Sequence, residues 1–167
     1  MTSLFYMIGL AILITTGLTG CKKNSETLEP LAGVLVKYEG CKQTASANII
    51  KSQANDCIEF TYDGANILTL KHTDCGFNCC PGSLSAELSL NGNQIIIIEK
   101  ENQQGCRCSC LYDLYYEIKN LHPGSYTIHI IEPNINANDP VMNFTIDLLS
   151  AASGSHCVER NYYPWVQ

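Results

Sequence analysis

The sequence predicts an all-β protein, an immunoglobulin-like antiparallel β-sandwich with disulfide cross-links. Three observations predict it: apolar and polar residues alternate along several segments, Asp-Gly and Asn-Gly pairs mark two hairpin turns, and no segment has a convincing amphipathic helical pattern. The chain has 167 residues, of which 46% are hydrophobic and 16% charged, as in a folded domain. We therefore expect one β-sandwich domain over residues 31–167.

The first predicted elements are one strand and two hairpins. Alternation of apolar residues over residues 34–38 predicts a strand, because successive side chains of a strand point to opposite faces. Asp63-Gly64 and Asn91-Gly92 stand where a type I′ turn needs positive φ at both central residues. In the second hairpin we expect Leu90 to pair with Asn93, which leaves one face apolar on both strands.

The second half of the sandwich is predicted by three more alternating segments, at residues 106–118, 125–130 and 142–148. Between the first two lies the segment Leu-His-Pro-Gly-Ser-Tyr at residues 121–126. It resembles the tyrosine corner of immunoglobulin-like and fibronectin-like sandwiches, in which the phenol hydroxyl bonds to backbone a few residues upstream. We expect Tyr126 to play this part.

The N-terminus predicts export. Residues 1–20 carry no charged side chain, and the apolar run Leu4–Ile14 has the length of a signal-peptide core and is too short to span a bilayer as a helix. The segment Leu18-Thr19-Gly20-Cys21 resembles the lipobox of bacterial lipoproteins. A secretory signal cut elsewhere and a buried apolar strand are the alternatives.

The lipobox resemblance implies that residues 1–20 are a lipoprotein signal peptide and that Cys21 is lipidated. The polar residues 21–30 then form a flexible tether between the lipid anchor and the domain. Several acyl chains give a stable membrane anchor, since one chain alone binds only marginally. We expect a protein of the bacterial cell envelope, and Lys22 after the lipidated residue favours the outer membrane.

Nine further cysteines are candidates for disulfides, the default thiol chemistry of an exported protein. They are Cys41, Cys57, Cys75, Cys79, Cys80, Cys106, Cys108, Cys110 and Cys157. If Cys106, Cys108 and Cys110 lie on one face of a strand, the β-carbons of neighbours among them are about 6.6 Å apart. A disulfide needs about 3.8 Å between β-carbons, and a tetrahedral zinc ion needs sulfurs roughly that close, so each of these thiols should find its partner elsewhere.

We therefore expect two or three bridges between the 75–80 loop and the 106–110 strand, and a separate link from Cys41 to Cys57. Cys157 could replace one member, and the pairing within the group stays open. The alternative is a metal-binding lipoprotein that uses the cluster of cysteines at positions 75, 79, 80, 106, 108 and 110. An exposed Cys-x-x-Cys at a helix start, as redox catalysis would favour, does not occur in the sequence.

The remaining polar residues do not indicate a particular reaction. The four histidines, at positions 72, 122, 129 and 156, could be ligands or acid-base groups. His122 in a turn and His129 on a polar strand face are expected at the surface. His156 is adjacent to Cys157, but adjacency in sequence does not give a nucleophile and a base the geometry they need. The Asn-rich loop 134–139 lacks the Gly and Glu of an EF-hand and is interpreted as an ordinary loop. The aromatic tail 162–165 is interpreted as a plug over the sandwich, with an exposed contact surface as the alternative.

Composition and motifs limit the function classes. A net charge of −6 without a basic cluster argues against nucleic acid as a partner. The sequence contains no nucleophile elbow, phosphate loop, dinucleotide fingerprint or zincin motif. No catalytic residue, metal ligand or cofactor is therefore assigned, and we lean against an enzyme.

Several spaced motifs carry a wider resemblance. They are Phe77-Asn78-Cys79-Cys80, Cys106-x-Cys108-x-Cys110-Leu111-Tyr112-Asp113-Leu114, Asn120-Leu121, Gly124-x-Tyr126-x-Ile128 and Tyr163-Pro164-Trp165. Together they resemble small uncharacterised cysteine-rich lipoproteins of Bacteroidota. The resemblance implies location and fold but no activity, so we expect a lipid-anchored structural or interaction module with the membrane and an unknown protein or glycan as partners.

Overall fold

The computed structural model describes residues 30–42, 54–103 and 105–160. The expected signal peptide, the lipidated Cys21, nearly all of the tether and the aromatic tail 162–165 lie outside the described residues. The part of the chain that the structure describes contains no helix long and apolar enough to cross a membrane.

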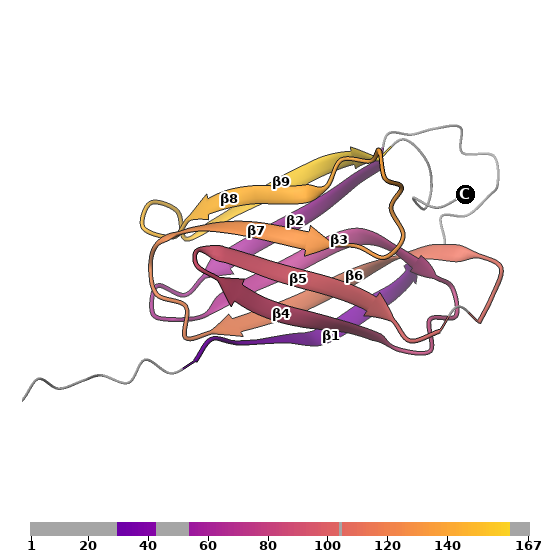
Figure 1. The fold of residues 1–167 in the computed structure, drawn as a ribbon, viewed down its shortest axis with the longest axis horizontal. Coiled ribbons are helices and arrows are strands. Elements are labelled where there is room, and N and C mark those ends of the chain that lie inside the picture. Colours follow the sequence, from indigo (N-terminus) through magenta and orange to yellow (C-terminus); the bar gives the residue numbers. More distant parts are fainter. Residues whose placement is uncertain (1–29, 43–53, 104, 161–167) are drawn as a thin grey trace, which may run out of the picture.

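The described residues form nine strands in two sheets that pack face to face (Figure 1). The strands are β1 (Ala32–Lys42), β2 (Ala54–Tyr62), β3 (Leu68–Asn78), β4 (Leu84–Asn91), β5 (Gln94–Glu101), β6 (Ser109–Lys119), β7 (Ser125–Ile131), β8 (Met142–Asp147) and β9 (Ser153–Arg160). One sheet has the order β1-β6-β3-β2-β9 and the other the order β4-β5-β7-β8. The predicted all-β sandwich with disulfide cross-links is confirmed.

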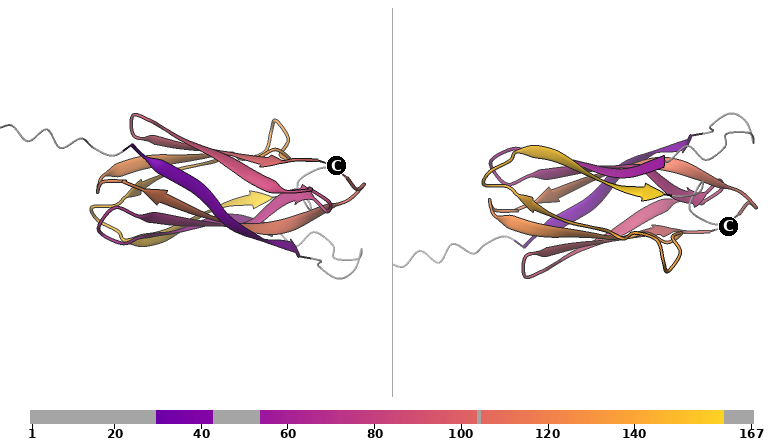
Figure 2. Two further views of the ribbon diagram at one scale, coloured as in Figure 1. Left: turned by 90° about the horizontal axis from the view of Figure 1, so that it is seen from below. Right: turned by 90° about the horizontal axis from the view of Figure 1, so that it is seen from above.

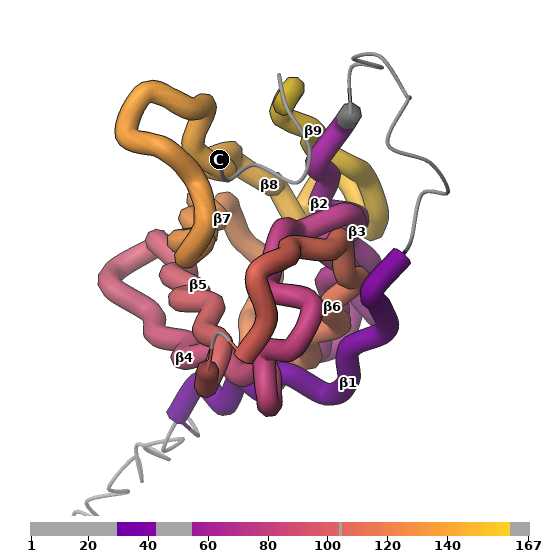
Figure 3. The backbone as a smooth tube through the Cα atoms, turned by 90° about the vertical axis from the view of Figure 1, so that its right-hand side faces the viewer, coloured from indigo at the N-terminus to yellow at the C-terminus, as the bar shows by residue number. Residues whose placement is uncertain are grey.

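The two layers separate clearly when the molecule is viewed from below, from above and along the strands (Figures 2 and 3). Strand β1 contacts β4 at one margin, and β8 contacts β9 at the other, so the sheets meet along both sides. The sheets are antiparallel except at one pairing. Strands β5 and β7 are parallel, because the chain passes through β6 in the opposite sheet between them.

The core lies between the sheets and is built by alternation. Ile95 and Ile97 of β5, like Leu68 and Leu70 of β3, point inward and are almost fully buried, while the residues between them are more exposed. Burying one such aliphatic side chain stabilises the fold by about 1.5–3 kcal/mol. The tyrosine corner is also present, since the Tyr126 hydroxyl donates to the His122 carbonyl at 2.9 Å.

Both predicted hairpins form, but their turns differ from the expected ones. The β2–β3 connection is longer than two residues, and the Asp63 carboxylate accepts three backbone N–H bonds of 2.8–2.9 Å within it. In the β4–β5 hairpin Leu90 pairs with Ile95 instead of Asn93. Gly92, with φ of 59°, takes the first central position of the turn, so the register moves by two residues and the buried faces are preserved.

Two strand boundaries correct the sequence analysis. β6 begins at Ser109, so Cys106 and Cys108 precede the strand and do not share a strand face with Cys110. β9 was not predicted, because Ser, Gly and His occupy its first half and leave few apolar positions. It nevertheless completes the five-stranded sheet beside β2.

Candidate functional site

Disulfides join eight of the nine cysteines among the described residues. The pairs are Cys41–Cys110, Cys57–Cys157, Cys79–Cys108 and Cys80–Cys106. The last two link the 75–80 segment to the 106–110 segment, as predicted.

The expected Cys41–Cys57 link is wrong. Cys57 lies directly opposite Cys157 on the adjacent strands β2 and β9, with their Cα atoms 4.0 Å apart. Cys41 sits at a bulge of β1 with φ of 48° and reaches Cys110 on the neighbouring β6. Both pairs follow from strand neighbours that sequence spacing does not reveal.

Cys75, expected among the disulfide candidates, is a free and fully buried thiol. It points between the sheets and donates to the Tyr112 carbonyl at 3.0 Å. No other free thiol occurs in the described residues. Burial raises the pKa of this thiol to about 12, so it is protonated at neutral pH.

A cluster of charged side chains lies in the core beside Cys75, and we call it the buried cluster. Its members come from both sheets: Asp56, His72, Glu99, Glu132, Arg160 and the hydroxyl of Tyr116. All of them are at least nine-tenths buried. This is the site that sequence reasoning missed.

One rule of alternation places these residues. Inward apolar positions of β3, β5 and the β7 segment run Leu68-Leu70-His72, Ile95-Ile97-Glu99 and Ile128-Ile130-Glu132, with the charged residue last in each. β2 and β9 repeat the pattern with Asp56 before Ile58 and Arg160 after Val158. Extending each alternating run by one inward position would have shown that these charged residues face the core.

His72 is the centre of the buried cluster. Its Nδ1 lies 2.6 Å from Oε1 of Glu99, and its Nε2 lies 2.5 Å from Oδ1 of Asp56. Burial lowers the pKa of His72, but Glu99 and Asp56 outweigh this and hold it well above its ordinary value. The Tyr116 hydroxyl donates to the same Glu99 oxygen at 2.6 Å.

Arg160 closes the other end of the buried cluster. Its Nε donates to Oδ2 of Asp56 at 2.9 Å, and its Nη2 donates to both Asp56 and Glu132. Burial favours the neutral form of Asp56, but His72 and Arg160 together lower its pKa. Burial, followed by repulsion from Asp56, raises the pKa of Glu132 to about 8, so Glu132 is mostly protonated at neutral pH.

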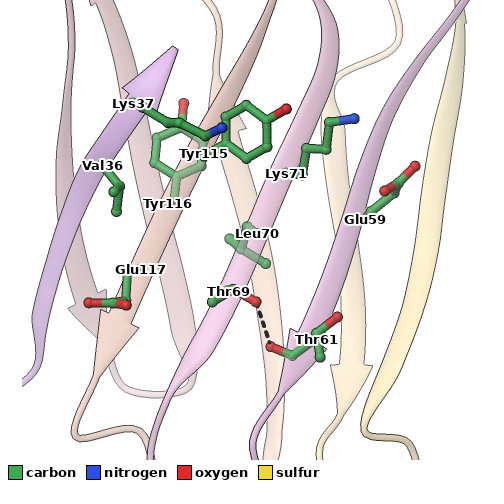
Figure 4. Close-up of a pocket in the computed structure, with 10 residues that line it drawn as sticks. All are labelled: Val36, Lys37, Glu59, Thr61, Thr69, Leu70, Lys71, Tyr115, Tyr116 and Glu117. Carbon is green, nitrogen blue, oxygen red and sulfur yellow. Dashed lines mark hydrogen bonds between the residues drawn. The ribbon is translucent and has the colours of Figure 1, made fainter. Parts of the chain in front are cut away.

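A second feature is an open depression of about 320 Å³ on the outer face of the five-stranded sheet (Figure 4). At its centre Lys37 Nζ lies 4.2 Å from the centroid of the Tyr115 ring and Lys71 Nζ lies 5.7 Å from it. The Tyr115 hydroxyl donates to Glu39 at 2.9 Å. The rim carries Thr61, Thr69, Glu59 and Glu117.

No family model, curated protein or solved structure matches this chain.

The other predicted candidates form no common site. His122 is exposed, as expected, whereas His129 is half-buried and not fully solvated. His156 stacks on Phe144 with ring centroids 4.6 Å apart. In the Asn-rich loop the Asp139 carboxylate accepts from the Asn136 N–H at 2.7 Å.

Proposed function

We propose that this chain is a lipid-anchored protein of the bacterial cell envelope whose disulfide-stapled β-sandwich acts as a binding module. The observation that carries this is the set of four disulfides. Such bonds form and persist in oxidising compartments and are rare in the cytosol. The lipobox at residues 18–21 supports the same location from the sequence side.

The depression on the outer sheet face is the surface that supports binding best. Its volume of about 320 Å³ lies at the small end of ligand sites, which span about 300–1,000 Å³. Its charged side chains balance, with Lys37 and Lys71 against Glu59 and Glu117. A balanced rim gives no advantage to a strongly charged ligand.

The depression brings hydrogen-bond donors and acceptors together near one aromatic ring. The lysines donate, the carboxylates accept, and the hydroxyls of Thr61 and Thr69 can do both, although the Thr69 hydroxyl donates to the Thr61 carbonyl at 3.1 Å (Figure 4). A ligand with many hydroxyl groups matches this set of donors and acceptors. We therefore assign the depression to a neutral glycan, in preference to a protein partner.

The glycan assignment is tested by binding the full chain to an array of neutral and charged glycans. The Glu117→Gln and Tyr115→Ala variants are compared with Glu87→Gln, a matched change on an exposed carboxylate of the other sheet. We expect binding to a neutral glycan that falls at least tenfold in the two depression variants and is unchanged in the control. Equal binding by all variants, or no glycan binding at all, refutes the assignment.

The envelope assignment has its own test, which the glycan result does not affect. Mass spectrometry of the mature protein should find acyl groups on Cys21 and one free thiol, Cys75, after denaturation. A Cys21→Ser variant should lose the acyl groups and remain unprocessed. An intact unacylated leader, or many reduced thiols with several bound metal ions, refutes this proposal and favours the cysteine-cluster metalloprotein.

A further inference from the structure

Two members of the buried cluster and the adjacent Cys75 thiol together offer three different types of metal ligand. We propose that His72, Cys75 and Glu99 bind a zinc(II) ion between the two sheets. One donor atom from each residue lies within 4.8 Å of the other two, and all three residues are buried. The ligands come from β3 and β5, so the ion would join the two sheets.

The donor set suits zinc. Zinc binds imidazole nitrogen, thiolate sulfur and carboxylate oxygen, with bonds of about 2.0–2.3 Å. In a tetrahedral site this places ligand atoms roughly 3.3–3.8 Å apart. The spacing among His72, Cys75 and Glu99 therefore needs only small side-chain adjustments, and the fourth position is left for the Tyr116 hydroxyl or a water.

The surrounding residues form the outer shell that a zinc-bound histidine requires. A ligating histidine almost always donates its other ring N–H to a carboxylate, which fixes the ring and the tautomer. Here Nε2 of His72 faces Asp56 at 2.5 Å, and Nδ1 faces Glu99 at 2.6 Å. Arg160 in turn holds the Asp56 carboxylate.

Two features are left unexplained by the ion pairs of the buried cluster alone. Oε2 of Glu99 is buried and accepts no hydrogen bond from the described part of the chain. Buried polar atoms without partners are rare and costly, and an unoccupied acceptor is what a cation would use. Cys75 is the second feature, because its thiol stays unpaired in a chain that oxidises its other eight described cysteines.

Zinc binding at this site leaves the net charge of the core unchanged. The zinc ion exchanges water ligands for the three side chains and displaces one proton from His72 and one from the Cys75 thiol. Two positive charges enter and two protons leave to solvent, so the net charge of the core does not change. A buried site can accept the ion on these terms without the large desolvation cost of a new net charge.

The experiment refolds the untagged full chain with zinc or with cobalt(II), because a closed site is filled most readily during folding. After removal of loose metal we expect one zinc per chain by elemental analysis. The cobalt form should show a thiolate-to-cobalt charge-transfer band and the intense visible bands of tetrahedral cobalt. A folded protein that retains no metal, or a cobalt spectrum without the thiolate band, overturns the proposal.

Isosteric variants locate the ion. Cys75→Ser should lose the charge-transfer band, Glu99→Gln should lose most of the bound metal, and Asp56→Asn should weaken zinc affinity by about 10–100-fold. The matched control is His129→Gln, a half-buried histidine on β7, which should keep one zinc. Wild-type affinity in both Cys75→Ser and Glu99→Gln overturns the proposal, and where a variant does not fold, the wild-type cobalt spectrum decides.

Discussion

Nε2 of His72 lies 2.5 Å from Oδ1 of Asp56, and both side chains are wholly buried between the sheets. Arg160 bonds the other oxygen of the same carboxylate. The chain thus takes two cationic groups and their partners out of water at one end of its core. The stability of this protein should depend strongly on keeping that cluster complete.

Removing one partner should therefore be severe. We expect Arg160→Met to lower the free energy of unfolding by about 3–5 kcal/mol, because it removes one positive charge from the buried cluster and leaves a buried negative charge there uncompensated. Urea unfolding measures the loss. The control is Lys37→Met, which breaks an exposed ion pair with Glu39 and should change stability far less, because solvent screens exposed charges. Similar losses in the two variants would contradict this interpretation of the buried cluster.

The metal-free protein should lose stability as pH rises from mildly acidic values. The pKa of Glu132 is raised to about 8 in the folded chain from an ordinary 4.5, so folding takes up a proton between these values. The contribution of Glu132 to the free energy of unfolding is therefore fully present below about pH 4.5, and it is lost as pH rises to about 8. The raised pKa of His72 acts in the same direction.

Glu132→Gln removes the first of these contributions, so the decline with pH should be shallower in this variant. Asp56 has the opposite effect, because folding lowers its pKa from an ordinary 3.8. Its contribution to stability is therefore lost as pH falls below about 3.8. Urea midpoints between pH 3 and 9 measure both limbs. A wild-type midpoint that rises from pH 5 to pH 8 would contradict the assignment.

The disulfides should differ in how much they stabilise the fold, according to the length of chain that each one closes. Cys57 and Cys157 are separated by 100 residues in the sequence, and Cys80 and Cys106 by 26. Chain entropy predicts losses of about 4.7 and 3.5 kcal/mol when each pair is replaced by alanine. Thermal unfolding of the two double variants should therefore rank the first as less stable, and the reverse order would contradict the entropic account.

The tyrosine corner makes a smaller contribution. Tyr126→Phe removes one hydrogen bond, to the His122 carbonyl, and should cost about 0.5–1.5 kcal/mol. Denaturant unfolding measures this change. Tyr115→Phe is the control, since its hydroxyl bonds the exposed Glu39, and a larger loss there would show that the corner is not a structural anchor.

The sequence could predict what depends on local pattern. The alternation over residues 125–130 and 142–148 determined two strands and the side that each one buries, because side-chain direction in a strand changes with every residue. The segment ending at Tyr126 determined the corner. His72, Glu99 and Glu132 each follow an alternating run of their own strand by one inward position. Extending those runs past the last apolar residue would have predicted that all three face inward.

Only the tertiary structure decided which strands became neighbours. Cys57 bonds Cys157 rather than Cys41 because β9 returns to pair with β2, and the spacing of cysteines carries no information on that return. The same holds for the buried cluster, whose members lie up to 104 residues apart, as in Arg160 and Asp56. Alternation fixes the face of one strand at a time, whereas convergence of five charged residues depends on the order of strands in both sheets.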